Sequence, residues 1–149
     1  MTVKKLHIFL LLLTAVIITA FLLWPSDESR IKKLFKEGSS AVEAEDIEKV
    51  LSKVAFSYHD DNGMTYLYIK DALKRQFDAL ADIDVEHEKL RITVSEKTAF
   101  AEMDVRVIAT LGSETGYIIG DIKKPLHLKF TLEKERTKWL IVKSEGFRL

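Results

Sequence analysis

The sequence has 149 residues, in which 23 lysines and arginines balance 23 aspartates and glutamates. This length suits one domain with an appended segment, and the balanced charge excludes the basic composition typical of nucleic-acid-binding domains. Cysteine is absent, which excludes disulfides, a thiol nucleophile and a cysteine-ligated metal site.

The first predicted element is an apolar helix near the N-terminus. Leu6–Trp24 contains no Asp, Glu, Lys or Arg, and as a helix it would span about 28 Å, close to the hydrocarbon core of a membrane. Trp24 lies where aromatic residues mark the membrane interface. A cleaved signal peptide is the alternative, but it should have a shorter apolar core and an Ala-x-Ala-like site. We therefore predict an uncleaved signal anchor over residues 1–25.

The orientation of this anchor follows from its flanking charges. Lys4 and Lys5 precede it, and Asp27 and Glu28 follow it, which favours a cytoplasmic N-terminus. We predict a single-pass protein of the inner (plasma) membrane, inserted through residues 6–24, with an extracytoplasmic C-terminal domain. Basic residues also follow the anchor, at Arg30, Lys32, Lys33 and Lys36. They are expected on a solvated helix face, and contact with anionic lipid head groups is the alternative.

Three helices are predicted after the anchor, with Ser26, Asp46 and Thr65 as their N-caps. The apolar stripe of the first helix is Ile31, Leu34, Phe35, Ala41 and Val42, and that of the third is Ile69, Leu73, Phe77 and Leu80. Gly38 lies on the first stripe and costs the helix about 1 kcal/mol relative to Ala. Either the helix breaks there, or another element packs closely against it.

Strands dominate the rest of the chain. Phe56–Tyr58, between the second and third helices, is predicted as a short strand, and His59–Gly63 has the composition of a turn. After Asp82 the apolar period changes to two. The four long strands of one antiparallel sheet are expected at Ile83–Ser95, Thr98–Gly112, Gly120–Lys134 and Lys138–Arg148, with a flexible connection at Gly112–Gly116.

The register of two hairpins is predictable from their turns. If Glu96 and Lys97 form a two-residue turn, the expected pairs are Arg91 with Glu102, Lys89 with Asp104, Ile92 with Ala101 and Leu90 with Met103. If Glu135 and Arg136 form the last turn, the pairs are Glu133 with Lys138, Leu132 with Trp139 and Phe130 with Ile141. In the first hairpin, opposite charges then meet on one face and apolar side chains on the other, as a one-sided sheet requires.

This order of elements resembles the nuclear transport factor 2-like superfamily, also called SnoaL-like or cystatin-like α+β. The resemblance covers residues 27–149, and its residues are the turn Tyr58-x-Asp60-Asp61-x-x-Gly63 and the strand Lys138-Trp139-Leu-Ile-Val142. It is closest to bacterial members that carry a membrane anchor. The resemblance implies a domain at residues 26–149 in which three helices pack on a curved antiparallel sheet of four long strands and one short strand. Such a cone can leave a pocket at its open end.

Members of this superfamily include ketosteroid isomerase, polyketide cyclases, dehydratases and an assembly subunit of type IV secretion systems, so function depends on the site. In the isomerase, an aspartate near this turn is the general base, beside an oxyanion hole of a tyrosine and a protonated aspartate. The resemblance therefore makes Asp60 and Asp61 candidate bases. Adjacent residues of an extended segment point to opposite sides, so at most one of them faces a pocket. Alternatively, both carboxylates cap the third helix and shape the turn.

Histidines are the other candidate bases. His59 and His87 qualify by residue type, but neither has a Ser or Cys partner at a supporting spacing. The four histidines, at positions 7, 59, 87 and 127, show no metal-ligand spacing. No metal and no cofactor are expected.

The expected ligand-binding residues are Tyr58, Tyr66, Tyr68, Met103 and Val105. The tyrosines would form an amphipathic wall at the pocket mouth, although ordinary packing is the alternative. Met103 and Val105 belong to an inner sheet face without an acid or a base, which favours an apolar ligand or a filled core.

Together these features predict a membrane-anchored, extracytoplasmic domain without catalysis, which binds a protein partner or a small apolar ligand in the cell envelope. One alternative is an enzyme of the isomerase, cyclase or dehydratase type that uses Asp60 or Asp61 as its base. Another is a scaffold subunit of an envelope complex.

Overall fold

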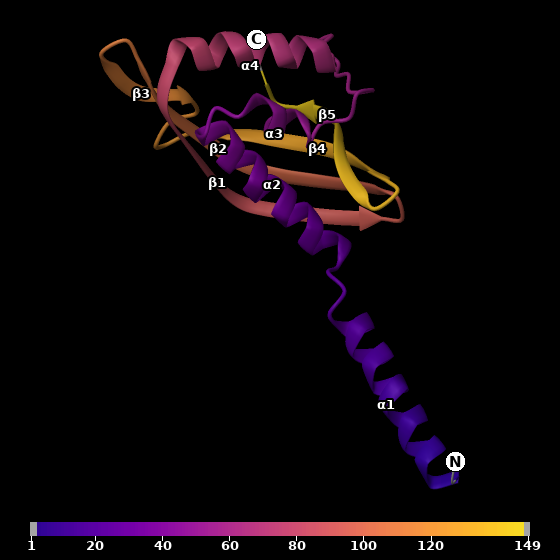
Figure 1. Cartoon of the computed structure of the whole chain (residues 1–149). Helices are drawn as coiled ribbons and strands as arrows, with labels where there is room; N and C mark the ends of the chain where they lie inside the picture. The colour runs from indigo at the N-terminus through magenta and orange to yellow at the C-terminus, as the bar shows by residue number, and fades with distance from the viewer. Residues whose placement is uncertain (1–2, 148–149) are drawn as a thin grey trace.

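The computed structural model describes residues 3–147. Its first helix, α1 (Val3–Leu22), is exposed from Lys5 to Leu22 and leads away from the remainder of the protein (Figure 1). Among the described residues, α1 is the one helix long and apolar enough to cross a membrane. Met1 and Thr2, which belong to the predicted anchor, lie outside the described residues.

Three further helices follow, and their predicted caps are confirmed. Ser26 Oγ accepts a hydrogen bond from Ser29 N (3.1 Å) at the start of α2 (Asp27–Glu43). Asp46 caps α3 (Ile47–Leu51) and Thr65 caps α4 (Tyr66–Ala79), in each case by accepting from the amide three residues ahead. These side chains satisfy amides that lack a partner within the helix, so local sequence alone determines where each helix begins.

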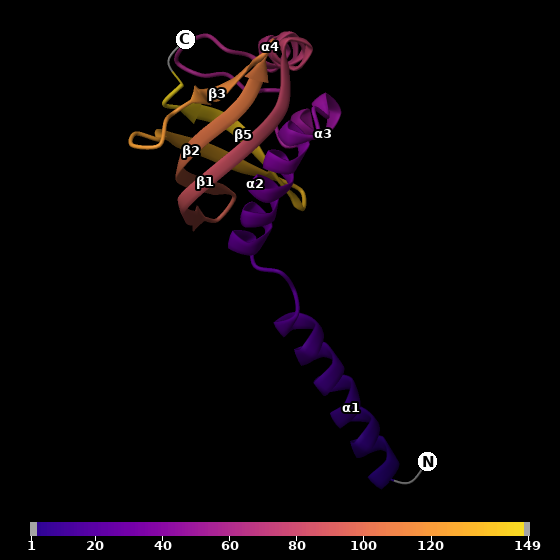
Figure 2. The ribbon, with the colours of Figure 1, turned by 90° about the vertical axis from the view of Figure 1, so that its left-hand side faces the viewer.

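One antiparallel sheet completes the α+β fold, which confirms the predicted class. Its strands are β1 (Leu80–Ser95), β2 (Thr98–Leu111), β3 (Glu114–Ile119), β4 (Leu126–Glu135) and β5 (Lys138–Glu145). They pair in the order β1-β2-β4-β5, and β3 also pairs with β2. Helices α2, α3 and α4 lie on one side of the curved sheet, and α2 runs across that face (Figure 2).

The short fifth strand is β3, and the prediction that placed it at Phe56–Tyr58 is wrong. Phe56 and Ser57 form a turn. In place of a strand, this segment has an isolated β-bridge between Val54 and Ile141 of β5. The predicted flexible connection at Gly112–Gly116 is also wrong, because Gly112 (φ 64°) adopts the left-handed conformation of a tight turn into β3. The predicted strand start at Gly120 is wrong as well, because residues 120–125 form a loop and β4 begins at Leu126. Arg148, the predicted end of the last strand, lies outside the described residues.

The first hairpin shows the predicted register only near its turn. Arg91 pairs with Glu102 and Ile92 with Ala101, as expected. A β-bulge at Lys89 (φ 56°) then shifts the register, so Glu88 pairs with Asp104, and the predicted pairs of Lys89 and Leu90 are wrong.

In the last hairpin the predicted pairs are all displaced. The turn lies at Arg136 and Thr137, one residue later than expected. The observed pairs include Glu133 with Leu140, Lys134 with Trp139, Leu132 with Ile141 and Phe130 with Ser144. Since the displacement near the turn is two positions, each side chain there keeps its predicted face.

The core lies between α2 and the covered face of the sheet. Ile31, Leu34 and Phe35 of α2 are buried, and the rings of Phe35 and Phe130 lie 5.1 Å apart. Along β2 every second residue is buried, from Ala99 to Ala109. No residue of α1 belongs to the described core, so we expect the domain that begins at Ser26 to fold without it.

Candidate functional site

The candidate site is an apolar cavity of about 360 Å³ between the helices and the sheet. Its helical walls come from Gly38 and Val42 of α2, Val50 of α3, and Ile69, Ala72 and Leu73 of α4. Phe130 of β4 and Ile141 of β5 form the sheet side. The polar residues among its lining are Lys53, Tyr58, Gln76 and Ser144.

The cavity exists because α4 does not press onto the sheet. The helix has no fully buried residue, and its apolar stripe of Ile69, Leu73 and Phe77 is only half-buried. Figure 1 shows α4 beyond α2 and α3, connected directly to β1. Apolar side chains that face an unfilled space are the usual lining of a small-molecule site.

Gly38 contributes to this space, and both predictions made for it are wrong. Helix α2 continues through Gly38 without a break. No atom lies within 4 Å of the position that a Cβ would occupy there, so no element packs closely either. The missing side chain leaves volume in the cavity wall.

A buried pair of hydroxyl groups provides the polar feature of the cavity. Tyr58 is 3% exposed, and its phenol oxygen shares a hydrogen bond with Ser144 Oγ from β5. The Tyr58 hydroxyl also donates to Asp60 Oδ2 (3.5 Å). The Tyr58 hydroxyl therefore lies between Ser144 and Asp60. Burial, the largest influence, raises the pKa of Tyr58, so the phenol is neutral at physiological pH.

Sequence reasoning missed Ser144 because a β-bulge reverses its face. Trp139 and Ile141 point inward, and strict alternation would direct Ser144 outward. The register shift between Thr131 and Leu132 leaves Val142 as the extra residue in β5. Ser144 therefore pairs with Phe130 and is buried. No local sequence signal marks this bulge.

Asp60 is held in the turn rather than in the cavity lining. Its Oδ1 accepts hydrogen bonds from the amides of Asn62 and Met64, both at 2.9 Å. With the Tyr58 hydroxyl on Oδ2, both carboxylate oxygens are engaged. This is the turn-shaping role that stood as the alternative to a general base.

The two neighbours of Asp60 face solvent. The side chain of Asp61 is 77% exposed and forms an ion pair with Lys143 (2.8 Å). The hydrogen bond to Asp61 is the main cause that raises the pKa of Lys143. His59 is exposed, and its Nδ1 lies 3.2 Å from the carbonyl oxygen of Ser57. Neither residue lines the cavity.

Of the five expected ligand-binding residues, only Tyr58 lines the cavity. Tyr66 packs against Phe56 with ring centroids 5.2 Å apart, and Tyr68 is exposed. Met103 and Val105 are buried in the core with Ile31 and Leu34 of α2. Their part of the sheet is therefore packed as a filled core, which is the alternative that the sequence left open for them.

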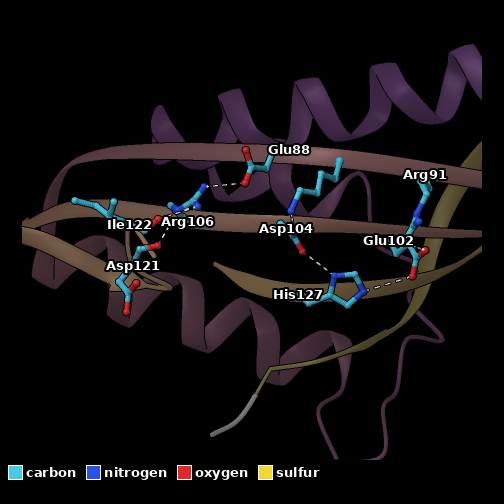
Figure 3. A network of polar contacts seen from close by, with 9 residues as sticks. Glu88, Arg91, Glu102, Asp104, Arg106, Asp121, Ile122 and His127 are labelled. Carbon is cyan, nitrogen blue, oxygen red and sulfur yellow. Dashed lines mark hydrogen bonds and ion pairs between the residues drawn. The ribbon is translucent and has the colours of Figure 1, made fainter. Parts of the chain in front are cut away.

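The uncovered face of the sheet carries a network of charges (Figure 3). His127 Nδ1 lies 2.8 Å from Asp104 Oδ1, and its Nε2 lies 3.4 Å from Glu102 Oε2. Lys89 reaches Asp104 from its bulge (3.0 Å). The hydrogen bond with His127 and then that with Lys89 hold the pKa of Asp104 below its ordinary value. His87 is exposed on β1, away from this network, and no metal-binding cluster occurs within residues 3–147.

No family model matches the sequence, and no curated protein matches it. Solved structures do resemble the fold. A nuclear transport factor 2-like protein of cystatin-like fold from Novosphingobium aromaticivorans is 15% identical (TM-score 0.63) and covers 97% of this chain and 88% of its own.

Two further structures agree. A candidate scytalone dehydratase from the same organism is 14% identical (TM-score 0.65; 83% of this chain, 89% of its own). A protein of unknown function with a cystatin-like fold from Nostoc punctiforme is 17% identical, with a TM-score of 0.62. The match covers 79% of this chain and 87% of that protein. These likenesses show that the chain has a nuclear transport factor 2-like, or cystatin-like, fold.

Proposed function

We propose that this protein is a membrane-anchored domain that binds a small, mostly apolar ligand in the cavity between α2, α4 and the sheet. The cavity itself is the observation that supports the proposal. Its walls are apolar apart from four polar residues, and its volume is within the range of small-molecule sites. The hydroxyl pair of Tyr58 and Ser144 provides one point where a polar group of the ligand is oriented.

The ligand is bound without chemical conversion. Within the described chain, the cavity lining contains no carboxylate and no imidazole. Asp60 is the acid that the Tyr58 hydroxyl contacts, and the turn and Tyr58 engage both of its oxygens. A general base needs an oxygen or nitrogen within reach of the substrate proton. For this reason the isomerase or dehydratase alternative has less support than binding.

Helix α1 anchors this domain in the proposal, with the N-terminus in the cytoplasm and the domain outside. The length and apolar composition of α1 support insertion, and Trp24 beyond its end is exposed, as an interface residue would be. The anchor keeps the cavity close to the membrane, where apolar molecules concentrate.

Co-purification tests the proposal and identifies the ligand in the same experiment. The fragment that begins at Ser26 is purified alongside its Gly38→Phe variant, which places a ring in the cavity wall. Small molecules are then extracted and identified by mass spectrometry. We expect an apolar compound in the wild type and its loss from the variant. The matched control is Thr93→Phe, which adds the same ring at an exposed position of β1, outside the cavity lining.

An equal amount of the compound in both proteins would contradict binding in this cavity. Conversion of the compound by the wild type, together with loss of this activity in Asp60→Asn, would instead support the enzyme alternative.

A further inference from the structure

A second groove, of about 340 Å³, lies beside the start of α2. Arg30, Lys33 and Glu37 of α2 form one wall, and Lys53 lies between the helix and the sheet. Thr137 and Lys138, at the turn between β4 and β5, form the other wall. The apolar cavity shares only Lys53 with this groove.

The groove has an excess of positive charge. Four basic side chains line it, against the single carboxylate of Glu37. Glu37 is shared between Lys53 and Lys33, and the hydrogen bond from Lys53 is the main cause that lowers its pKa. Within residues 3–147, neither Arg30 nor Lys138 forms an ion pair with a carboxylate.

Two neighbouring acids are engaged by other side chains. Asp27 accepts hydrogen bonds from Lys134 (2.8 Å) and from the indole of Trp139 (3.0 Å). Glu28 forms an ion pair with Lys32 (2.9 Å). Glu135 is the cross-strand partner of Lys138, but no ion pair joins them within residues 3–147. The cations of Arg30 and Lys138 can therefore meet an external anion.

The position of the groove identifies the source of that anion. The guanidinium of Arg30 lies 5.9 Å from the ring centroid of Trp24, which closely follows α1. Arg30 Nη1 also donates to the carbonyl oxygen of Thr137 (3.3 Å). One side chain thus joins the end of the apolar helix to the far wall of the groove. If Trp24 lies at the membrane interface, Arg30 lies at the depth of the lipid phosphates.

We propose that this groove binds the phosphate of an anionic membrane lipid such as phosphatidylglycerol. The proposal rests on the proposed insertion of α1. The basic surface continues along α2 to Lys36 in a neighbouring groove, and Lys36 forms no ion pair with a carboxylate within residues 3–147. The helix therefore presents a further cation beyond the first phosphate. A bound head group would fix the orientation of the domain above the bilayer.

The test uses the full chain in micelles of a neutral detergent. Short-chain phosphatidylglycerol, short-chain phosphatidylcholine and inorganic phosphate are titrated separately. The readouts are the NMR signals of the Thr137 amide and the Trp139 indole N–H, both at the groove. We expect saturable shifts with phosphatidylglycerol, and much weaker shifts with phosphatidylcholine and with inorganic phosphate.

A double variant, Lys33→Gln with Lys138→Gln, removes two exposed charges without touching the core. Because lysines near an anionic surface each strengthen lipid binding, we expect the affinity for phosphatidylglycerol to fall by roughly thirtyfold. The matched control is Lys123→Gln with Lys124→Gln, exposed residues in the loop before β4, at the end of that strand away from the groove. It should bind like the wild type.

The proposal would be overturned if phosphatidylcholine or inorganic phosphate caused shifts as large as those with phosphatidylglycerol, or if phosphatidylglycerol caused none. It would also be overturned if the Lys123→Gln, Lys124→Gln control lost as much affinity as the groove variant. This test is independent of the test of ligand binding in the apolar cavity, because Gly38→Phe should leave the phosphatidylglycerol titration unchanged.

Discussion

Tyr58 and Ser144 share a buried hydrogen bond although 86 positions separate them in the sequence. The bond joins the segment before α4 to the end of β5, and it lies in the lining of the apolar cavity. Its energy in a buried setting and its place in the cavity make it both a structural contact and the proposed polar anchor of a ligand.

The pH dependence of stability should reveal this contact. Burial raises the pKa of Tyr58 above its ordinary value of about 10, so the folded state holds the phenol proton more tightly than the unfolded state. The stabilisation is complete below pH 10 and is lost as the pH rises above it. We expect the advantage of the wild type over Tyr58→Phe in unfolding free energy to shrink above about pH 10. Urea unfolding across this range measures it, and a constant difference would contradict the expectation.

Gly38→Ala should stabilise the protein. Alanine favours the helical conformation by about 1 kcal/mol over glycine, and its methyl group would meet no atom within 4 Å. Urea unfolding should show an increase of about 0.5–1 kcal/mol in unfolding free energy. A loss of stability would mean that the wall around Gly38 is closer than the structure shows.

Asp60 and Asp61 should differ in their contribution to stability. Asp60→Ala leaves the amides of Asn62 and Met64 without an acceptor and removes one of the two partners of the Tyr58 hydroxyl, which should cost about 1–3 kcal/mol. Asp61→Ala removes an exposed ion pair with Lys143 and should cost much less than Asp60→Ala, because solvent screens exposed ion pairs. Thermal or urea unfolding of the two variants provides the comparison. Equal costs would refute the assigned role of Asp60 in the turn.

The proposed orientation is open to a direct test because the chain contains no cysteine. Lys97, exposed at the turn between β1 and β2, is replaced by cysteine. A membrane-impermeant maleimide should label this variant in intact cells. Labelling only after permeabilisation would place the domain in the cytoplasm, and release of the protein from the membrane fraction would argue against the anchor.

Local features of the chain were predictable because they depend on residues close in sequence. Ser26, Asp46 and Thr65 bond to amides three residues ahead, so the three helix starts do not depend on the rest of the fold. The alternation of β2 likewise specified its buried face. The order of these elements was sufficient to indicate the α+β class.

The candidate site depended on contacts between distant segments. The bulge opposite Thr131 turned Ser144 inward, and the hydrogen bonds of Asp60 engaged a carboxylate that its sequence context left available. The cavity arises from how far α4 stays from the sheet, which no single stretch encodes. Sequence patterns therefore determined where the helices begin, which residues form most strands and which face of β2 is apolar. Only tertiary packing decided the space and the polar groups inside it, because both depend on which distant side chains meet.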